Sequence, residues 1–150
     1  MVRNAAAAVV LNHVVYVFCG AGDNGSNLNS IERLAMEGAG GREAYEEAWQ
    51  LIEPSTDILS VRYYPAAVAI NNTEIAILAG YDSDYKKDLV LFNTEDNSVN
   101  KVVEDADGSY YPNTNQAALI APEEIIVLTG RDGNGSPTLI TWKKGKERLE

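Results

Sequence analysis

Cysteine and histidine are almost absent from this 150-residue chain, which contains one of each, Cys19 and His13. A single cysteine cannot form an intrachain disulfide, and this agrees with a reducing compartment, so a cytoplasmic location is expected. One Cys and one His cannot supply the four ligands of the usual zinc site. His13 lies between two strand-like runs, which predicts a turn residue. No metal and no cofactor are therefore expected.

Long hydrophobic runs are also lacking, since no apolar segment approaches the roughly 20 residues that span a bilayer. The start, "MVRNAAAAVVLNHVVYVF", has the order of a signal peptide. It breaks at Asn12-His13, however, and two later segments match it, so we interpret it as part of the fold. Basic residues are few, 12 against 22 acidic ones, giving a net charge of −10. Nucleic acids and anionic membranes are thus disfavoured as partners.

Three windows of the chain resemble one another: "AAVVLNHVVYVFCG" (7–20), "AVAINNTEIAILAG" (67–80) and "AALIAPEEIIVLTG" (117–130). Each begins with small apolar residues, breaks at a polar pair, and runs apolar into a small residue and a glycine. This pattern is typical of strand, tight turn and strand. Gly20, Gly80 and Gly130 are predicted to end the second strand in a sharp turn with positive φ.

Further strands are expected after each glycine. Leu34, Phe92 and Trp142 end a third strand, and Trp49 and Val99 open fourth strands in "WQLIE" and "VNKVVE". Four short strands in a unit that recurs at roughly 50 residues are typical of β-propeller blades. One such sheet cannot bury both its faces alone, so neighbouring sheets must stack on it.

This repeat resembles the kelch family of β-propellers, in which a hydrophobic run enters a glycine pair, followed by a Tyr and a Trp at set spacing. Here Cys19, Ala79 and Thr129 replace the first glycine. The resemblance implies an all-β fold of about three kelch-type blades, each a four-stranded antiparallel sheet, in an incomplete ring. The expected units are 1–55 with an insert at 37–47, 60–105, and 110–150 with a truncated fourth strand. Another chain, or missing blades of a longer protein, would complete the ring.

Gly20, Gly22 and Gly25 also satisfy the G-x-G-x-x-G pattern of dinucleotide-binding sites. That function requires a helix to begin at the glycines. The residues that follow, "SNLNSIERL", start with types that favour turns over helix interiors. We therefore interpret the glycine string as a turn.

Two acidic segments raise the question of a cation site, and only the second could bind a cation weakly. "DGNGS" (132–136) is similar to the start of a calcium loop, but Pro137 stands where the sixth-position glycine is needed. The second copy carries three acids in its loop, Asp82, Asp84 and Asp88. A solvated loop is the preferred interpretation of both segments.

Tyrosines and arginines gather in the loops that enter the inner strands and in those that join the second and third strands. In a propeller these two loop sets share one face; the candidate binding residues are Arg3, Arg62, Tyr63, Tyr64, Tyr81, Tyr110, Tyr111 and Arg131. Tyr and Arg are enriched in binding hot spots, and the kelch resemblance implies that a peptide or protein binds this face. We therefore expect a non-catalytic interaction module. The alternative is that these tyrosines only pack between blades.

An enzymatic function is the second hypothesis, because some kelch-like propellers are copper-radical oxidases or sugar mutarotases. The oxidase needs two His ligands, and this chain has one His. A mutarotase-like or lyase-like enzyme acting on sugars stays open. The inner strands, however, carry no paired carboxylates for acid–base chemistry.

Overall fold

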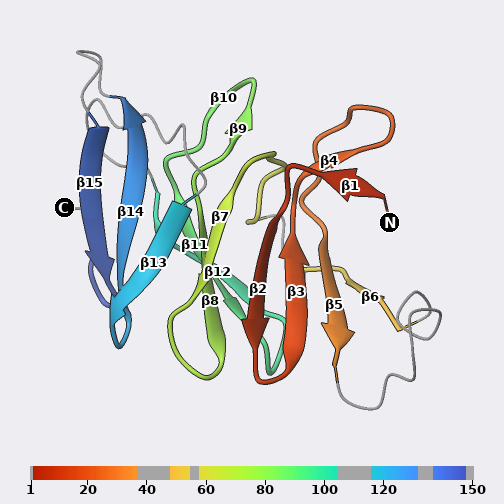
Figure 1. Cartoon of the computed structure of the whole chain (residues 1–150), viewed down its shortest axis with the longest axis horizontal. Helices are drawn as coiled ribbons and strands as arrows, with labels where there is room; N and C mark the ends of the chain where they lie inside the picture. Colours follow the sequence, from red (N-terminus) through yellow and green to blue (C-terminus); the bar gives the residue numbers. More distant parts are fainter. Residues whose placement is uncertain (1, 37–47, 55–57, 105–115, 132–136, 148–150) are drawn as a thin grey trace.

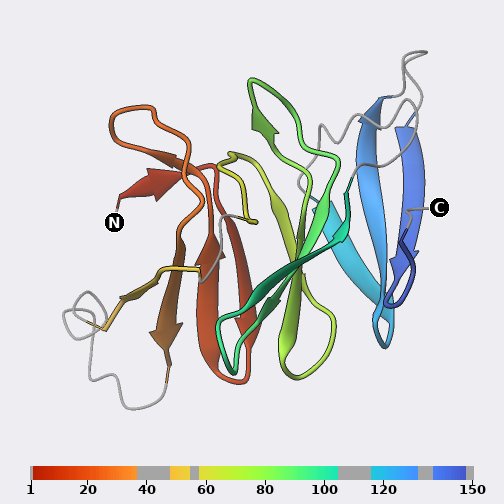
Figure 2. The same cartoon turned by 180° about the vertical axis from the view of Figure 1, so that it is seen from behind.

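All regular elements in the part of the chain that the structure describes are β-strands. The structure is a computed structural model and describes residues 2–36, 48–54, 58–104, 116–131 and 137–147. Three antiparallel sheets lie side by side along the molecule, in the order of the sequence, and the two chain ends lie at opposite ends of the row (Figures 1 and 2). No described helix is long and apolar enough to cross a membrane.

The first sheet has the order β2-β3-β5-β6. Its strands are Ala7–Leu11 (β2), Val14–Phe18 (β3), Ile31–Ala35 (β5) and Gln50–Ile52 (β6). The expected strand, turn and strand are confirmed here. β6 begins one residue after Trp49, the predicted start of the fourth strand.

The second sheet repeats this order with β7-β8-β11-β12. Its strands are Ala66–Ala69 (β7), Glu74–Leu78 (β8), Leu89–Asn93 (β11) and Val99–Val103 (β12). The third sheet has three described strands, Gln116–Ala121 (β13), Glu124–Arg131 (β14) and Pro137–Lys143 (β15). β14 continues through Gly130, so the strand does not end at this glycine as it was expected to.

Two short ribbons extend from the ends of the sheets. Arg3–Asn4 (β1) pairs with Ala21–Gly22 (β4), and Tyr81–Asp82 (β9) pairs with Asp84–Tyr85 (β10). The glycine string lies here: Gly22 N–H donates to Ser26 O, and Gly25 N–H donates to Gly22 O. These bonds close a tight turn, which confirms the interpretation of G-x-G-x-x-G as a turn.

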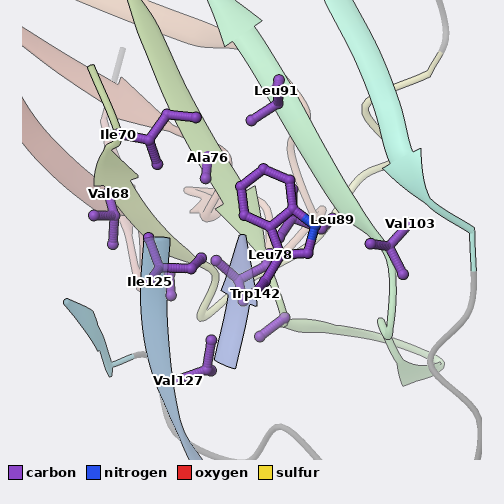
Figure 3. Close-up of a cluster of buried hydrophobic side chains, with 12 residues drawn as sticks. Val68, Ile70, Ala76, Leu78, Leu89, Leu91, Val103, Ile125, Val127 and Trp142 are labelled. Carbon is purple, nitrogen blue, oxygen red and sulfur yellow. The ribbon is translucent and has the colours of Figure 1, made fainter. Parts of the chain in front are cut away.

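The second sheet is buried on both faces because its side chains alternate. Ile75 and Ile77 of β8 pack in a cluster with Tyr16 and Phe18 of the first sheet. The residues between and beyond them, Ala76 and Leu78, point to the other face and pack with the third sheet. Figure 3 shows the indole of Trp142 among the side chains of this second cluster. Two hydrophobic layers therefore join the three sheets.

The first hairpins of the first two sheets differ by one residue. Leu11 pairs with Val14 across a two-residue turn, in which Asn12 and His13 have φ of 51° and 60°, as a type I′ turn requires. In the second sheet a three-residue turn follows Ile70, closed by Asn71 Oδ1, which accepts from Thr73 N and Glu74 N. The gap-free alignment of the windows is therefore offset by one residue in the first strand. Ala7 corresponds to Ala66, because these residues pair with the equivalent Phe18 and Leu78.

Candidate functional site

Four tyrosines form one continuous group of rings at the end of the second sheet, which we call the tyrosine cluster: Tyr63, Tyr64, Tyr81 and Tyr85. Successive ring centroids lie 5.1 Å apart (Tyr63–Tyr64), 5.5 Å apart (Tyr63–Tyr81) and 5.2 Å apart (Tyr81–Tyr85). The interplanar angles of 62°, 66° and 75° are edge-to-face. This is a favourable arrangement of aromatic rings. The rings are not sealed inside, since Tyr64 is 52% exposed and the others are half-buried.

Backbone pairing brings two distant loops together to build this cluster. Tyr63 N–H donates to Tyr81 O at 3.1 Å, and Tyr81 N–H donates to Tyr63 O at 2.9 Å. Tyr63 comes from the loop that enters β7, and Tyr81 from the loop that joins β8 and β11. Asn4 and Ala21 pair in the same way in the first sheet. The two loop sets that the sequence placed on one face are thus adjacent in both sheets.

The backbone also holds Tyr64 outward. Its N–H donates to Ala5 O at 2.7 Å, and its φ is 55°, which is uncommon for a bulky residue. The equivalent Ala5 of the first sheet has a φ of 52°, so this conformation belongs to the loop pairing that the two sheets share. The bond to Ala5 therefore fixes the backbone position of the most exposed tyrosine.

Arg62, which the sequence analysis expected on the binding face, is fully buried next to this cluster. Its guanidinium donates to both carboxylate oxygens of Asp88, at 2.8 and 2.9 Å. It also donates to Ala79 O at 3.1 Å, to Ser60 O at 3.2 Å and to Ser60 Oγ at 2.9 Å. All five donors of the fork are used, as a buried Arg requires. Arg62 is a scaffold residue of the loops.

Arg3 has an equivalent position in the first sheet and is largely buried as well. It donates to Cys19 O at 2.8 Å, just as Arg62 donates to Ala79 O, and its Nη2 lies 3.0 Å from Glu32 Oε2. Each arginine precedes the first alanine of its inner strand by four residues (Arg3–Ala7, Arg62–Ala66). This recurring spacing is the sequence signal that could have identified both arginines as buried.

The remaining candidates are only partly placed. Tyr110 and Tyr111 lie outside the described residues, and Arg131 is the last residue of β14. Tyr85 was missed by sequence reasoning. The feature that places Tyr85 in the cluster is the short ribbon β9–β10, in which Tyr85 pairs with Tyr81 across a tight turn at Ser83.

Carboxylates border the tyrosine cluster. Asp82 Oδ1 accepts from Asn27 Nδ2 at 2.7 Å, and its other oxygen lies 4.0 Å from Lys86 Nζ. Asp84 is exposed, and Asp88 is engaged by Arg62. In the described ranges, no three His, Cys, Asp or Glu residues gather closely enough to hold a metal ion.

The one thiol is not placed for nucleophilic chemistry. Cys19 is fully buried, and burial raises the pKa of its thiol to about 12. The reactive thiolate is therefore not formed at neutral pH. A hollow of about 290 Å³ beside the first sheet is lined, among the described residues, by Val14, Arg33, Ala35, Ala48 and Gln50, and none of these five is a carboxylate.

A scan of the chain against models of protein families finds no match, and a search among curated proteins likewise finds no match.

Proposed function

We propose that this chain is a non-catalytic interaction module of kelch-repeat type, whose sheets are successive propeller blades and whose tyrosine cluster binds a protein or peptide. The observation that carries the proposal is the continuous group of four rings. Aromatic rings give a large contact area at low cost in conformational entropy, and each Tyr keeps a hydroxyl for hydrogen bonding. Repetition of the strand order and of the loop pairing in two sheets supports the blade assignment.

The preorganisation of the cluster supports binding further. Arg62 joins the loop of Ser60, the end of β8 and Asp88 through a bonded network. Its backbone also ties the second sheet to the first, because Gly20 N–H donates to Arg62 O and Arg62 N–H donates to Leu28 O. Loops held in this way lose little freedom when a partner binds.

The charge around the cluster favours a partner segment that carries Lys or Arg beside apolar residues. Asp82 and Asp84 flank the rings and Lys86 lies beside Asp82, so the negative potential comes mainly from the whole chain, whose net charge is −10. Cations are attracted both by this negative potential and by the faces of the tyrosine rings.

Selection from a random peptide library displayed on phage, with the wild-type chain as bait, tests this proposal. We expect basic peptides with apolar neighbours to be enriched. A selected peptide, measured by calorimetry, should lose roughly tenfold or more in affinity for the Tyr64→Ser/Tyr85→Ser double variant, as expected for hot-spot residues.

The matched control is Trp49→Ser, which removes another half-exposed aromatic, 38% exposed, from the first sheet. This variant should bind the peptide as the wild type does. Circular dichroism checks that all three proteins are folded. Equal affinity for the wild type and the folded tyrosine variant would contradict the proposal, as would a library from which nothing is enriched.

A further inference from the structure

Each sheet has two different faces, one toward the next sheet in the sequence and one toward the preceding sheet. We call the face toward the next sheet in the sequence the leading face and the opposite one the trailing face. The leading face of the first sheet, with Tyr16 and Phe18, packs on the trailing face of the second, with Ile75 and Ile77. The leading face of the second sheet packs on the trailing face of the third in turn. Leading-on-trailing contact therefore occurs twice in the chain.

One leading face is left without a described neighbour, that of the third sheet. Leu139 pairs with Leu128 as Leu89 pairs with Leu78, so Leu139 and Leu89 occupy equivalent positions. Leu89 is fully buried against the third sheet, whereas Leu139 is 58% exposed. A position that is core in the second sheet is thus an exposed leucine in the third.

The trailing face of the first sheet is open in part: Leu34, which pairs with Val15, is 7% exposed, whereas other apolar residues of this face are not covered. Val10 pairs with Val15, and Val15 corresponds to the fully buried Ile75 of the second sheet. On this face Val10 is 59% exposed and Leu51 is 48% exposed. Val10 stands at the position of Ala69, which packs between the first and second sheets, whereas Lys101 stands at the position of Leu51.

We propose that the leading face of the third sheet binds the trailing face of the first sheet in a second copy of the chain, head to tail. The two open faces are of opposite kind, and this pair of faces already forms both contacts inside the chain. Two leading faces or two trailing faces have no such precedent. The contact is heterologous, because different patches meet on the two copies. It depends on the packing alone and is independent of the proposed binding function.

Light scattering on the purified chain tests this proposal. We expect the mass to rise above the 16.3 kDa of one copy as concentration increases. Leu139→Glu destroys the leading face and Val10→Glu the trailing face, so each variant alone should stay at the mass of one copy. Leu119→Glu is the control. It adds the same charge at a leucine that is 46% exposed but pairs with Ile125 on the trailing side, and it should associate as the wild type does.

Mixing the two variants provides the decisive measurement. Leu139→Glu keeps an intact trailing face and Val10→Glu an intact leading face, so an equimolar mixture should form a one-to-one complex of twice 16.3 kDa. Recovery on mixing also demonstrates that both variants are folded. A wild-type mass that stays at one copy at every soluble concentration would overturn the proposal. Association of either variant by itself would also overturn head-to-tail contact. So would a mixture of the two variants in which no complex forms.

Discussion

Two consecutive residues with positive φ end the second strand of both complete sheets. Cys19 and Gly20 have φ of 58° and 99°, and Ala79 and Gly80 have φ of 60° and 96°. The first reason for glycine at these positions is the positive φ. The second is space, since a Cβ on Gly20 would lie 2.6 Å from Asn4 O and one on Gly80 would lie 3.0 Å from Tyr63 O. Asn4 and Tyr63 lie in the loops that enter the sheets. The two glycines therefore allow these loops to approach the loops that follow the second strands.

Gly20→Ala should lower the free energy of unfolding by roughly 3 kcal/mol or more, because the clash with Asn4 O adds to the cost of the left-handed backbone. Gly25→Ala is the matched control: its φ is also positive, 75°, but nothing lies within 4 Å of the added Cβ. It should cost only about 1 kcal/mol. Urea unfolding measures both, and equal losses would contradict the role assigned to the close approach.

Sequence reasoning at this scale was right about the conformation of two glycines and wrong about the place of Arg62. The positive φ of Gly20 and Gly80 follows from the local need to reverse the chain. The burial of Arg62 depends on Asp88, which lies on another loop and is brought near only by strand pairing. An arginine in a polar loop sequence looks like a surface residue until its partner is known.

Hairpin turns also connect neighbouring sheets through polar contacts, at the end opposite the tyrosine cluster. Asn12 Nδ2 donates to Asn72 O at 2.7 Å, and Asn71 Nδ2 donates to Glu123 Oε1 at 3.0 Å. Lys144 Nζ contacts Glu74 Oε2 and lies 3.2 Å from Glu123 Oε1. The turns therefore follow one another along the row in the same order as the sheets.

Replacing Lys144 by Met should make stability depend less on pH. Hydrogen bonds from Asn71 and then Lys144 lower the pKa of Glu123 below its ordinary 4.5, and the hydrogen bond to Glu74 raises the pKa of Lys144 above 10.5. A lowered carboxyl pKa stabilises the fold above about pH 4.5 and is lost as the pH falls through the folded value. A raised lysine pKa stabilises below about pH 10.5 and is lost as the pH rises through the folded value.

Thermal unfolding measured across this pH range checks the prediction. The wild type should unfold at a higher temperature than Lys144→Met at neutral pH, and the difference should shrink at both extremes. Lys146→Met removes a nearby exposed lysine and should leave the wild-type profile unchanged. A difference that is constant with pH would contradict the ionic contribution.

The second sheet couples the whole molecule because it belongs to both hydrophobic clusters. Ile75, Ile77 and Phe92 pack with the first sheet, and Leu78, Leu89 and Leu91 pack with the third. Loss of either neighbour would expose one of these apolar faces to water. Unfolding of one sheet should therefore destabilise the next.

The two tryptophans of the chain permit a test of this coupling, since Trp49 immediately precedes β6 and Trp142 lies in β15. In Trp142→Phe the fluorescence reports on the first sheet, and in Trp49→Phe on the third. We expect each fluorescence transition in urea to coincide with the circular dichroism transition of the same variant, as for a two-state domain. Separate midpoints would mean that the sheets unfold independently.

The period-two alternation of apolar residues, the polar breaks and the turn glycines predicted the strands and hairpins of the sheets correctly, apart from the end of β14 at Gly130, because these features depend on neighbours in the chain. The same local pattern could not reveal the one-residue offset of the first strand, since both turn lengths are compatible with it. Nor could it distinguish Leu89 from Leu139, which share a position in the repeat and differ only in whether another sheet lies against them. The tyrosine cluster likewise arises from pairing between loops that are distant in sequence. Burial and ring contacts are properties of long-range packing, and therefore the folded arrangement decided them.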